Sequence, residues 1–591
     1  PLGASAGQVF FPARLSSMNV AHLALGAQFL HAGTWYRPAY YPWPGEDRIA
    51  SIEREVINVR RNVGMIDLST LGGIDIRGPA AAELMNRLYT GGFKGLAVGK
   101  SKYALMCNES GVVIDDGVAA RLTETHFYVT STTTGVENVY RQMLKWNVQW
   151  QLDVDITNVT GAYCVVNLAG PKSKQVLARL TTSDLDDVSF PYLGVREGVV
   201  AGIPARMLRV GFVGELGYEI HVPQTFGMHL WKSLAAAGAT FDIAPFGVEA
   251  QRLLRLEKGH IIIGQDTDAM THLRELGMSW AVSRKKSFFI GDRTTAEIDT
   301  TQMTRRLAGF IVESANRMNV PQESQLGLQG DRMVGRVTSA AYSPTLDKVV
   351  GLAYVPATSA VGDTITIKVD QGHGLQAILC ELPFYDPRVE RQRVSDVSVA
   401  AIKESSPERT SLIRALHVDV ETSDVETSVV ETSVFIVDRT LSDRCGVRGS
   451  AAAGWLESLS MLVPDKPNRA RIQKDGAVLA RLSVGEFLLL GGSDYLGCHP
   501  EEADGNYSLP RADSHAWMVV SGVHSREVLQ SVCSIDLRPR CFSDGDVAQT
   551  LMFGISVILI RADENFHLCA DITSSQYLYD ALGETVNSML I

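Results

Sequence analysis

The sequence predicts an α+β protein that contains an all-β module and a second, shortened body of related α+β fold. Three observations support this class. A strand–glycine–helix unit occurs three times, short apolar runs separated by Gly, Pro and Asp fill residues 305–385, and one motif near residue 120 returns near residue 480. The chain has 591 residues, enough for about four structural units. Its 45% apolar content excludes disorder of the whole chain.

An aromatic and proline-rich lead-in segment, residues 1–45, precedes the first predicted helix. Its rings suit an interface or a stacking platform, although a segment lying over its own core is the favoured interpretation. The rings belong to Trp35, Tyr36, Tyr40, Tyr41 and Trp43. Apolar residues then recur at spacings of three and four from Ile49 to Val63, which predicts an amphipathic helix. We expect Asp47 to cap this helix and Gly64 to end it.

The strand–glycine–helix unit is defined by three glycines. Counted from Gly78, Gly170 and Gly522, the sixth, seventh and tenth following residues are apolar in every copy. This is the spacing of one helix face. Pro79 and Pro171 suit the first turn of a helix, where the missing N–H is not needed.

The all-β module is predicted from residues 305–385. Val350–Val355 and Asp363–Val369 are examples of its short apolar runs. Turn residues between such runs are typical of a small antiparallel barrel or sandwich.

The final 157 residues, 435–591, are interpreted as a shortened copy of the first body. The motif ARLTETHF at 120–127 returns as ARLSVGEF at 480–487, and the third glycine unit follows it in the same order. Coincidence is the alternative, since each motif alone is weak. Aligning the two motifs places Gly476 opposite Asp116, so any chemistry of that acid is absent from the copy.

A linker is predicted between the two bodies, at residues 391–434. The unit Val-Glu-Thr-Ser recurs every five residues within 420–433, a period of neither helix nor strand. Acidic, Ser/Thr-rich sequence buries too little apolar area to offset its ordering. A surface loop inside one domain is the less favoured alternative.

Charge and composition exclude several classes of protein function. The net charge of −11 argues against a general binder of nucleic acid or of an anionic membrane, and no apolar run is long enough for a transmembrane helix. Eight sparse cysteines without a CxxC pair indicate reduced thiols, so we expect a cytoplasmic protein. The 13 histidines show no ligand spacing, and no metal site is expected. The start at Pro1, without Met or signal peptide, leads us to expect a processed chain or a piece of a larger one.

Nucleotide-binding loops are also not expected. Gly95–Ser101 is one residue short of a Walker A loop, because Lys94 stands where the first glycine is needed. Gly211, Gly214 and Gly217 do not form a dinucleotide motif either. If redox chemistry occurs, the nicotinamide is expected on another chain.

Two acidic segments are candidates for chemistry. Asp115 and Asp116 would point to opposite sides of an extended segment, so that one can serve in a pocket as a general base or an anchor for a ligand amine. From the pattern alone, an Asp-Gly hairpin turn is the favoured alternative. Glu215 and Glu219 lie in a glycine-rich stretch whose backbone can approach a ligand closely. A hairpin with exposed acids is about as well supported.

Several segments together resemble the aminomethyltransferase family, the folate-binding T-protein of glycine cleavage and its relatives. The resemblance spans about 46–390 and rests on VGMIDLSTLGGIDIRGP (63–79), MCNESGVVIDDG (106–117), GELGYE (214–219), GQDTD (264–268) and LPFYDPR (382–388). Three further segments resemble the C-terminal half of the α-subunit of heterotetrameric sarcosine oxidases: TWYRPAYYP (34–42), RLEKGH (255–260) and MSWAVSRKKSFFIG (278–291). A weaker resemblance, to the γ-subunit, covers 435–591 through FSDGDVAQT (542–550) and FHLCAD (566–571).

The resemblance implies a domain order and a set of ligands. The domains would be a folate-binding body at 46–290, a β-barrel at 291–390, the linker and a γ-like body at 435–591. This chain would bind tetrahydrofolate. A flavin-containing β-type subunit with FAD or FMN would be a partner, with NAD and a nucleotide-binding α N-terminal part as further candidates. The substrate would be an N-methylamine of the sarcosine type.

The resemblance also implies roles for five residues. Asp116 would be the base near N10 of the folate, and Glu219 would contact the pterin. Tyr103 and Trp280 would flank the folate. Phe212 stands where the family has a tyrosine, so one hydrogen bond would be lost.

The leading functional hypothesis is therefore the folate-binding part of an amine-demethylating flavoenzyme. A stand-alone folate-dependent methyl- or aminomethyltransferase is a second hypothesis. A folate-binding assembly module without catalysis is a third.

Overall fold

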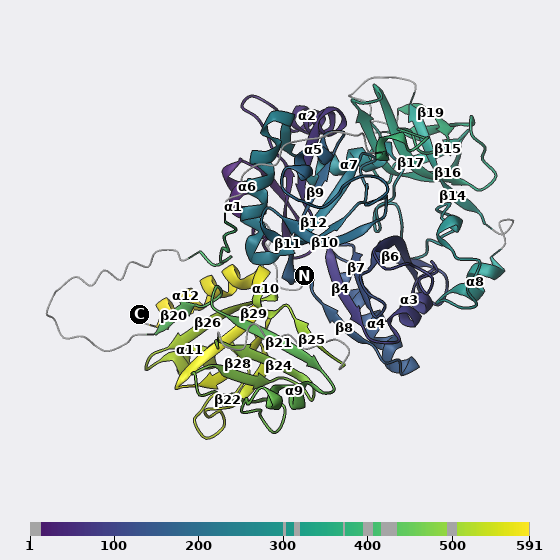
Figure 1. Cartoon of the computed structure of the whole chain (residues 1–591). Helices are drawn as coiled ribbons and strands as arrows, with labels where there is room; N and C mark the ends of the chain where they lie inside the picture. The colour runs from purple at the N-terminus through teal and green to yellow at the C-terminus, as the bar shows by residue number, and fades with distance from the viewer. Residues whose placement is uncertain are drawn as a thin grey trace.

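The computed structural model describes residues 14–298, 303–312, 320–369, 373–393, 406–414, 434–492 and 505–589. It consists of a first α+β body, a β-barrel beside it and a second α+β body (Figure 1). The predicted fold class is confirmed. None of the helices in these ranges is long and apolar enough to cross a membrane, and no disulfide joins the seven cysteines within them.

The first body contains two sheets. The first sheet has the order β5 (Lys100–Cys107), β6 (Val113–Arg121), β7 (His126–Ser131), β4 (Gly72–Arg77) and β8 (Asp155–Asn158). Helices α3 (Ala81–Leu88) and α4 (Val136–Trp150) pack on it around a shared apolar core. The second sheet has the order β10 (Val195–Val200), β11 (Ile203–Leu208), β12 (Gly217–Pro223), β9 (Tyr163–Ala169), β3 (Val63–Asp67) and β13 (Ile243–Pro245).

The second sheet is covered on both faces. Its helices are α2 (Arg48–Arg61), α5 (Ser173–Ala178), α6 (Gly227–Gly238) and α7 (Val248–Glu257). Two separate cores result, one against α5 and α6 and the other against α2 and α7. The lead-in segment forms α1 (Asn19–Ala24), β1 (Gln28–Ala32) and β2 (Trp35–Tyr40), and β2 lies against α7. Trp35 and Tyr41 are buried, as expected for a segment that covers its own core, whereas Trp43 is 58% exposed.

The helix predicted from Ile49 is α2. Its N-terminus is capped as expected, because the Asp47 carboxylate accepts a 2.8 Å hydrogen bond from the Ala50 N–H. The prediction for Gly64 is wrong. The helix ends at Arg61, and Gly64 lies in β3, where a Cβ would come within 2.5 Å of the Val59 side chain. The glycine permits close packing of helix on strand.

The all-β module is a closed barrel. Its strand order is β14 (Arg305–Val312), β17 (Lys348–Pro356), β16 (Arg332–Ser343), β15 (Leu326–Gln329), β18 (Thr364–Lys368) and β19 (Gly374–Cys380). The short helix α8 (Asp292–Glu297) precedes it. Closure leaves no free edge, since β14 pairs with both β17 and β19.

The second body repeats the two sheets of the first. One sheet has the order β22 (Arg469–Ile472), β23 (Val478–Arg481), β24 (Glu486–Leu490), β21 (Arg444–Gly449) and β25 (Asn506–Leu509). The other has the order β20 (Phe435–Asp438), β26 (His515–Ser521), β29 (Asn565–Asp571), β28 (Ile555–Ala562) and β27 (Val547–Met552). Read from β27 to β20, this strand order matches the order from β10 to β3 in the second sheet of the first body. The described helices are α9 (Ala452–Ser458), α10 (Arg511–Ser514), α11 (Ser525–Val532) and α12 (Ser575–Met589).

The recurring ARL motifs form the same turn in both bodies. Arg121 donates to the carbonyls of Leu96 and Glu124, and its guanidinium lies over the Phe127 ring. Arg481 makes the matching contacts with the carbonyls of Pro464 and Val484 and with the Phe487 ring. The recurrence is structural, and the prediction of a related second body is confirmed.

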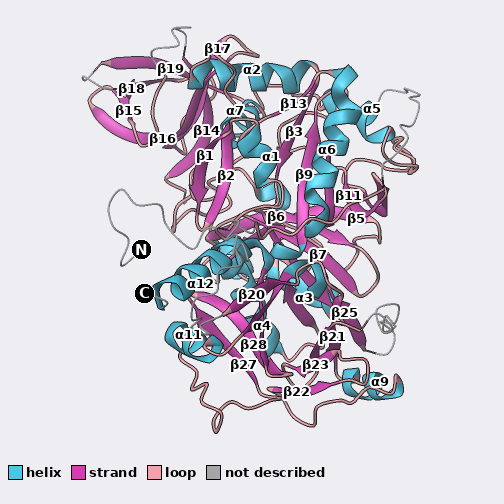
Figure 2. Ribbon diagram, turned by 90° about the vertical axis from the view of Figure 1, so that its left-hand side faces the viewer, coloured by secondary structure: helices cyan, strands magenta, loops and turns pink. Residues whose placement is uncertain are grey.

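The two bodies meet through reciprocal contacts; the second body fills the lower half of Figure 2, where α3 and α4 of the first body overlap it. Arg77 directly precedes Gly78, and Arg448 directly precedes Gly449 at the matching place in the second body. Their strand partners are Asp155 and Tyr507. Across the interface, Arg77 lies over the Tyr507 ring at 5.3 Å and Arg448 pairs with Asp155 at 2.8 Å. Contacts of this reciprocal kind are typical of a two-fold interface.

Part of the predicted linker is docked between the bodies. The Thr410 N–H donates to the Thr225 carbonyl at 2.8 Å, and Ile413 is buried in the core of the second body. Residues 406–414 are therefore held by both bodies. The Val-Glu-Thr-Ser repeats at 420–433 lie outside the described residues. The linker and domain boundaries stay predictions.

The unit glycines yield a stability prediction. Gly170 has φ +132°, and a Cβ there would lie 2.5 Å from the Asn62 carbonyl oxygen. We expect Gly170→Ala to destabilise the protein by more than about 2 kcal/mol. Gly583→Ala, in α12 with open space around the position, should instead stabilise it by about 0.5–1 kcal/mol. Urea unfolding of both variants measures the change in the free energy of unfolding. Equal changes in the two variants would contradict a special backbone requirement at Gly170.

Candidate functional site

The segment Asp115–Gly117 lies within strand β6, so the hairpin-turn alternative is wrong. The pairing of β5 with β6 shifts between Met106 and Cys107, where a β-bulge is located. Bulges redirect side chains and are frequent beside active sites. Asp115 is paired with Met106 and Asp116 with Leu105, so the two acids face opposite sides of the sheet, as expected.

Asp116 forms a cluster with two aromatic residues. Its Oδ2 accepts a 2.7 Å hydrogen bond from the Tyr103 hydroxyl, and both residues are half-buried. The Tyr103 ring lies 5.4 Å from the Trp280 ring, and Trp280 is 69% exposed. Burial raises the pKa of Asp116 to about 6, although the Tyr103 hydrogen bond opposes the shift. A carboxylate of this kind can accept a proton near neutral pH.

Asp115 points away from this cluster. It is 1% exposed, and its Oδ1 accepts hydrogen bonds from the N–H groups of Asp116 and Thr132, at 2.8 and 3.3 Å. Its Oδ2 faces Gly135, just before α4. Burial and then the charge of Asp116 raise the pKa of Asp115 to about 7.

The raised pKa of Asp115 predicts a pH dependence of stability. An unfolded aspartate has a pKa of about 3.9, so above that pH the native state retains a proton that the unfolded state has lost. The free energy of unfolding should therefore fall as the pH rises from about 4 to about 7, by at most about 1.4 kcal/mol for each pH step of one. Asp115→Asn should flatten this slope in urea unfolding at several pH values. Asp475→Asn, at the aligned exposed position, should leave the slope unchanged.

Glu215 is structural, and its interpretation as a ligand-reading acid is wrong. It is fully buried and accepts hydrogen bonds from Arg60 at 3.1 Å and from the Tyr385 hydroxyl at 2.7 Å. The neighbouring glycines pack closely against other residues of the protein, so their backbone is not left open to a ligand. A Cβ on Gly217 would come within 2.5 Å of the Val210 carbonyl, and one on Gly214 within 3.0 Å of the Lys258 side chain.

Glu219 and Phe212 contact residues outside the Tyr103–Asp116–Trp280 cluster. Glu219 is 8% exposed in the centre of the second sheet, with its Oε2 3.6 Å from Nε2 of His221. Phe212 stacks on His260 with ring centroids 5.6 Å apart, and its carbonyl accepts from Nδ1 of His260. The predicted roles of both residues stay predictions.

A cavity that the sequence did not indicate lies beside the acid-bearing strand. Its volume is about 630 Å³, and it is lined by Ile114 of β6, by the loop 263–269 and by barrel residues around Arg336. The lining is largely polar and includes Asp268 and Glu323. The cavity thus lies between the first body and the barrel. Its lining comes from three segments that are far apart in the sequence, and no local pattern reveals it.

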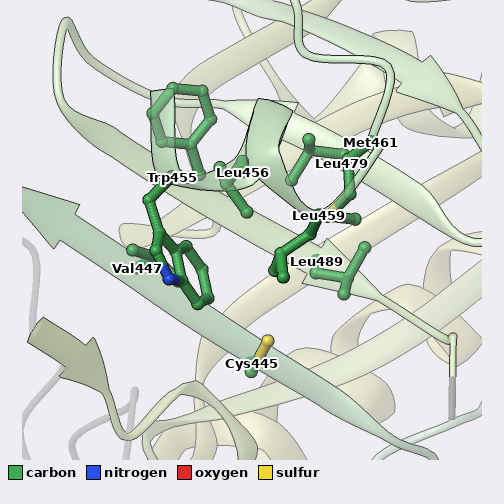
Figure 3. A pocket seen from close by; sticks show the side chains of 9 residues that line it. Cys445, Val447, Trp455, Leu456, Leu459, Met461, Leu479 and Leu489 are labelled. Carbon is green, nitrogen blue, oxygen red and sulfur yellow. The ribbon is translucent and has the colours of Figure 1, made fainter. Parts of the chain in front are cut away.

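The second body has a pocket of another kind, under α9 (Figure 3). Its lining is apolar apart from Cys445 and the indole N–H of Trp455. Asp475 and Gly476, aligned with the acid pair, lie in the turn between β22 and β23. No acid occupies the place of Asp116 there, and this pocket offers no general base.

Comparisons with known proteins agree with this architecture. Residues 18–286 match the family described as "GCVT N-terminal domain", and residues 305–386 match "Glycine cleavage T-protein C-terminal barrel domain". The "Sarcosine oxidase subunit alpha" of Corynebacterium sp. (strain P-1) is 37% identical over 402 residues, which are 66% of this chain and 41% of that protein. The "Aminomethyltransferase" of Thermotoga petrophila is 30% identical over 371 residues, which are 63% of this chain and 97% of that protein.

A solved structure shares the fold. The glycine cleavage system aminomethyltransferase T from Bartonella henselae matches with a TM-score of 0.57 and 22% identity, over 65% of this chain and 99% of that one. The chain spans about 41% of the length of the sarcosine oxidase α-subunit that it matches, whereas it covers the Thermotoga aminomethyltransferase almost completely. With its two-sheet body and six-stranded barrel, the chain belongs to the aminomethyltransferase family of the glycine cleavage T-protein.

Proposed function

We propose that this chain is the tetrahydrofolate-binding part of a multi-subunit, flavin-dependent N-methylamine oxidase or dehydrogenase of the sarcosine oxidase type. It captures the oxidised methyl group as 5,10-methylene-tetrahydrofolate. The observation that carries the proposal is the cluster of Tyr103, Asp116 and Trp280 in the first body, which has the aminomethyltransferase fold. A half-buried acid with a raised pKa lies there beside two rings.

The cluster fits the chemistry of a reduced folate. A pterin is flat and carries N–H groups, so exposed Trp280 and the Tyr103 ring provide stacking surfaces and Asp116 provides an acceptor. When bound, tetrahydrofolate supplies two nitrogen nucleophiles, N5 and N10. Asp116 accepts the proton that leaves N10 on ring closure, and Tyr103 holds the carboxylate in place. Glu219 contacts the pterin, and Phe212 lines the site without the hydroxyl that its relatives carry.

The remaining parts of the enzyme are assigned to other chains. Sarcosine oxidase α-subunits extend well beyond the region that this chain matches. We assign FAD or FMN to a β-type partner subunit and NAD to a nucleotide-binding α N-terminal part. The assembly is placed in the cytoplasm. Its substrate is an N-methylated amine.

A stand-alone folate-dependent methyl- or aminomethyltransferase is the second candidate. The chain covers 97% of the length of the Thermotoga aminomethyltransferase, so that fold is complete here. The two candidates differ in their need for flavin. Only under the second candidate does the isolated chain transfer a methyl or aminomethyl group to tetrahydrofolate without a flavin subunit.

Titration with tetrahydrofolate tests the proposal. Binding should change the fluorescence of the full chain, and Trp280→Phe should remove most of that change. Turnover of sarcosine to methylene-tetrahydrofolate should then require the flavin subunit. Binding without turnover in the complete assembly would support a non-catalytic folate module instead, and absence of binding would overturn the proposal.

A further inference from the structure

Lys286 is a half-buried lysine that lies against the end of helix α3 and the turn after it. Its Nζ donates to the carbonyls of Asn86 and Gly91, at 2.9 Å each, and to the carbonyl of Tyr89. An ammonium group has three N–H donors, so these three carbonyls use all of them. The last carbonyls of a helix have no partner within it. Lys286 therefore completes the end of α3 from a position 200 residues after Asn86.

Holding a lysine in this place has an energetic cost. Burial lowers the pKa of Lys286 to about 7, and the positive charge of Lys102 on β5 adds to this shift. Asp292 and Cys107 oppose it. A helix end is commonly closed by a glycine, which carries no such cost. A role beyond the closure of α3 would account for the lysine.

The turn that Lys286 binds also holds the segment that carries Trp280. The hydroxyl of Thr90, a residue of this turn, donates to the Ala281 carbonyl at 3.0 Å. The Ser283 N–H donates in return to the Thr90 carbonyl, also at 3.0 Å. Trp280 directly precedes Ala281 in the short helical turn 279–281. The segment 281–286 is therefore fixed to one turn at both of its ends, by Thr90 and by Lys286.

These contacts lead from Lys286 to the candidate site. The Trp280 ring lies 5.4 Å from the Tyr103 ring, and the Tyr103 hydroxyl donates to Asp116 at 2.7 Å. Trp280 is 69% exposed, so packing in a core does not fix its position. The position of the ring depends instead on the backbone that carries it, and that backbone is held by the turn after α3.

We propose that Lys286 is a positioning residue for tetrahydrofolate: by binding the turn after α3, it holds Trp280 beside Tyr103, ready to stack on the pterin. The inference rests on the proposed function and deepens it. A ring that is already held in place loses little freedom when the ligand arrives, so this preorganisation contributes to affinity. Lys286 acts through Trp280 and is not a catalytic residue. In the simpler alternative, it only closes the end of α3.

Calorimetric titration of the full chain with tetrahydrofolate tests the proposal. We expect Lys286→Met to weaken binding about 10-fold, because the released segment lets Trp280 leave its stacking position. Lys286→Arg, which restores a cation with N–H donors, should recover part of the affinity. Lys285→Met, at the exposed preceding residue, should leave the affinity unchanged. Equal affinities of Lys286→Met and the unmodified chain would overturn the proposal.

A double-mutant cycle separates positioning of Trp280 from general support of the fold. Trp280→Ala should weaken tetrahydrofolate binding at least as much as Lys286→Met does. Adding Lys286→Met to Trp280→Ala should then have no further effect, because the ring that Lys286 positions is absent. If the two losses of affinity multiply instead, Lys286 does not act through Trp280, and its role is the structural one.

Backbone hydrogen exchange, measured by mass spectrometry without ligand, gives a readout that does not depend on folate. Lys286→Met should speed exchange within residues 279–286 and leave exchange in the barrel unchanged. Unchanged exchange in this segment would contradict the proposed contact. If the segment is released but the unmodified chain binds no tetrahydrofolate, the proposed function fails while the anchoring of Trp280 by Lys286 stands. Lys286→Gln, which keeps two N–H donors, supplies the same comparisons if Lys286→Met does not fold.

Discussion

Replacing Asp116 with asparagine is expected to slow formation of methylene-tetrahydrofolate by about 10²- to 10⁴-fold. Asparagine keeps the shape of the side chain and an oxygen for the Tyr103 hydroxyl, which lies 2.7 Å away. It cannot accept the proton from N10. Tetrahydrofolate should therefore bind almost normally while the chemical step fails. Single-turnover assays in the co-purified assembly, together with tetrahydrofolate titrations, separate the two effects.

Asp115→Asn is the matched control for this experiment. The neighbouring acid faces the start of α4 instead of the Tyr103–Asp116–Trp280 cluster, so its loss should change the rate far less. In the unmodified protein, the rate should rise with pH through about 6, because Asp116 acts as a base only when ionised. Full activity of Asp116→Asn, or equal losses in the two variants, would remove Asp116 from the role of base.

The unit glycines were predictable because their backbone requirement restricts the residue type. Gly78, Gly170 and Gly522 all have positive φ, and each leads from a strand into a helix. A fourth unit follows Gly449, where φ is +147°, and leads into α9. Its residues Trp455, Leu456 and Leu459 have the same spacing, so the sequence marks this unit as clearly as the other three.

The candidate site was predictable only in part, because its contacts are non-local. The family motif indicated Asp116, whereas the pattern Asp-Asp-Gly alone favoured a turn. What places the acid in a strand is the pairing with β5 and the bulge within it. The prediction for Glu215 failed for the same reason. Its partners Arg60 and Tyr385 are 155 and 170 residues away in sequence.

Arg37, which is 8% exposed on β2, shows what a sequence pattern cannot convey. The residue belongs to the segment TWYRPAYYP, where a charged side chain among aromatic residues is expected to be solvated. Its burial depends on the loop after β7, nearly 100 residues later. The docking of 406–414 was not predictable for a related reason, since Leu412 and Ile413 are too few to mark a buried segment.

Replacing Arg60 with methionine is expected to destabilise the protein by about 3–5 kcal/mol. Arg60 is 3% exposed and binds two buried carboxylates: Glu257 through Nε and Nη2, at 2.9 and 2.7 Å, and Glu215 through Nη1. Its remaining N–H groups reach backbone carbonyls, and its guanidinium lies 4.0 Å from the centre of the Tyr385 ring. The variant leaves Glu257 without a cation and Glu215 with only Arg391.

The location of this ion cluster gives the prediction a second readout. Glu257 also accepts from Ser343 of barrel strand β16, and Tyr385 follows the barrel, so Arg60 holds the barrel against the first body. Arg60→Met should therefore make the barrel more sensitive to limited proteolysis. Adding Glu257→Gln should restore part of the lost stability, because it removes an unpaired charge. Arg61→Met, at the exposed next residue of α2, should stay within about 0.5 kcal/mol of the unmodified protein in urea unfolding. Similar small effects of both arginine variants would mean that the cluster does not hold the two parts together.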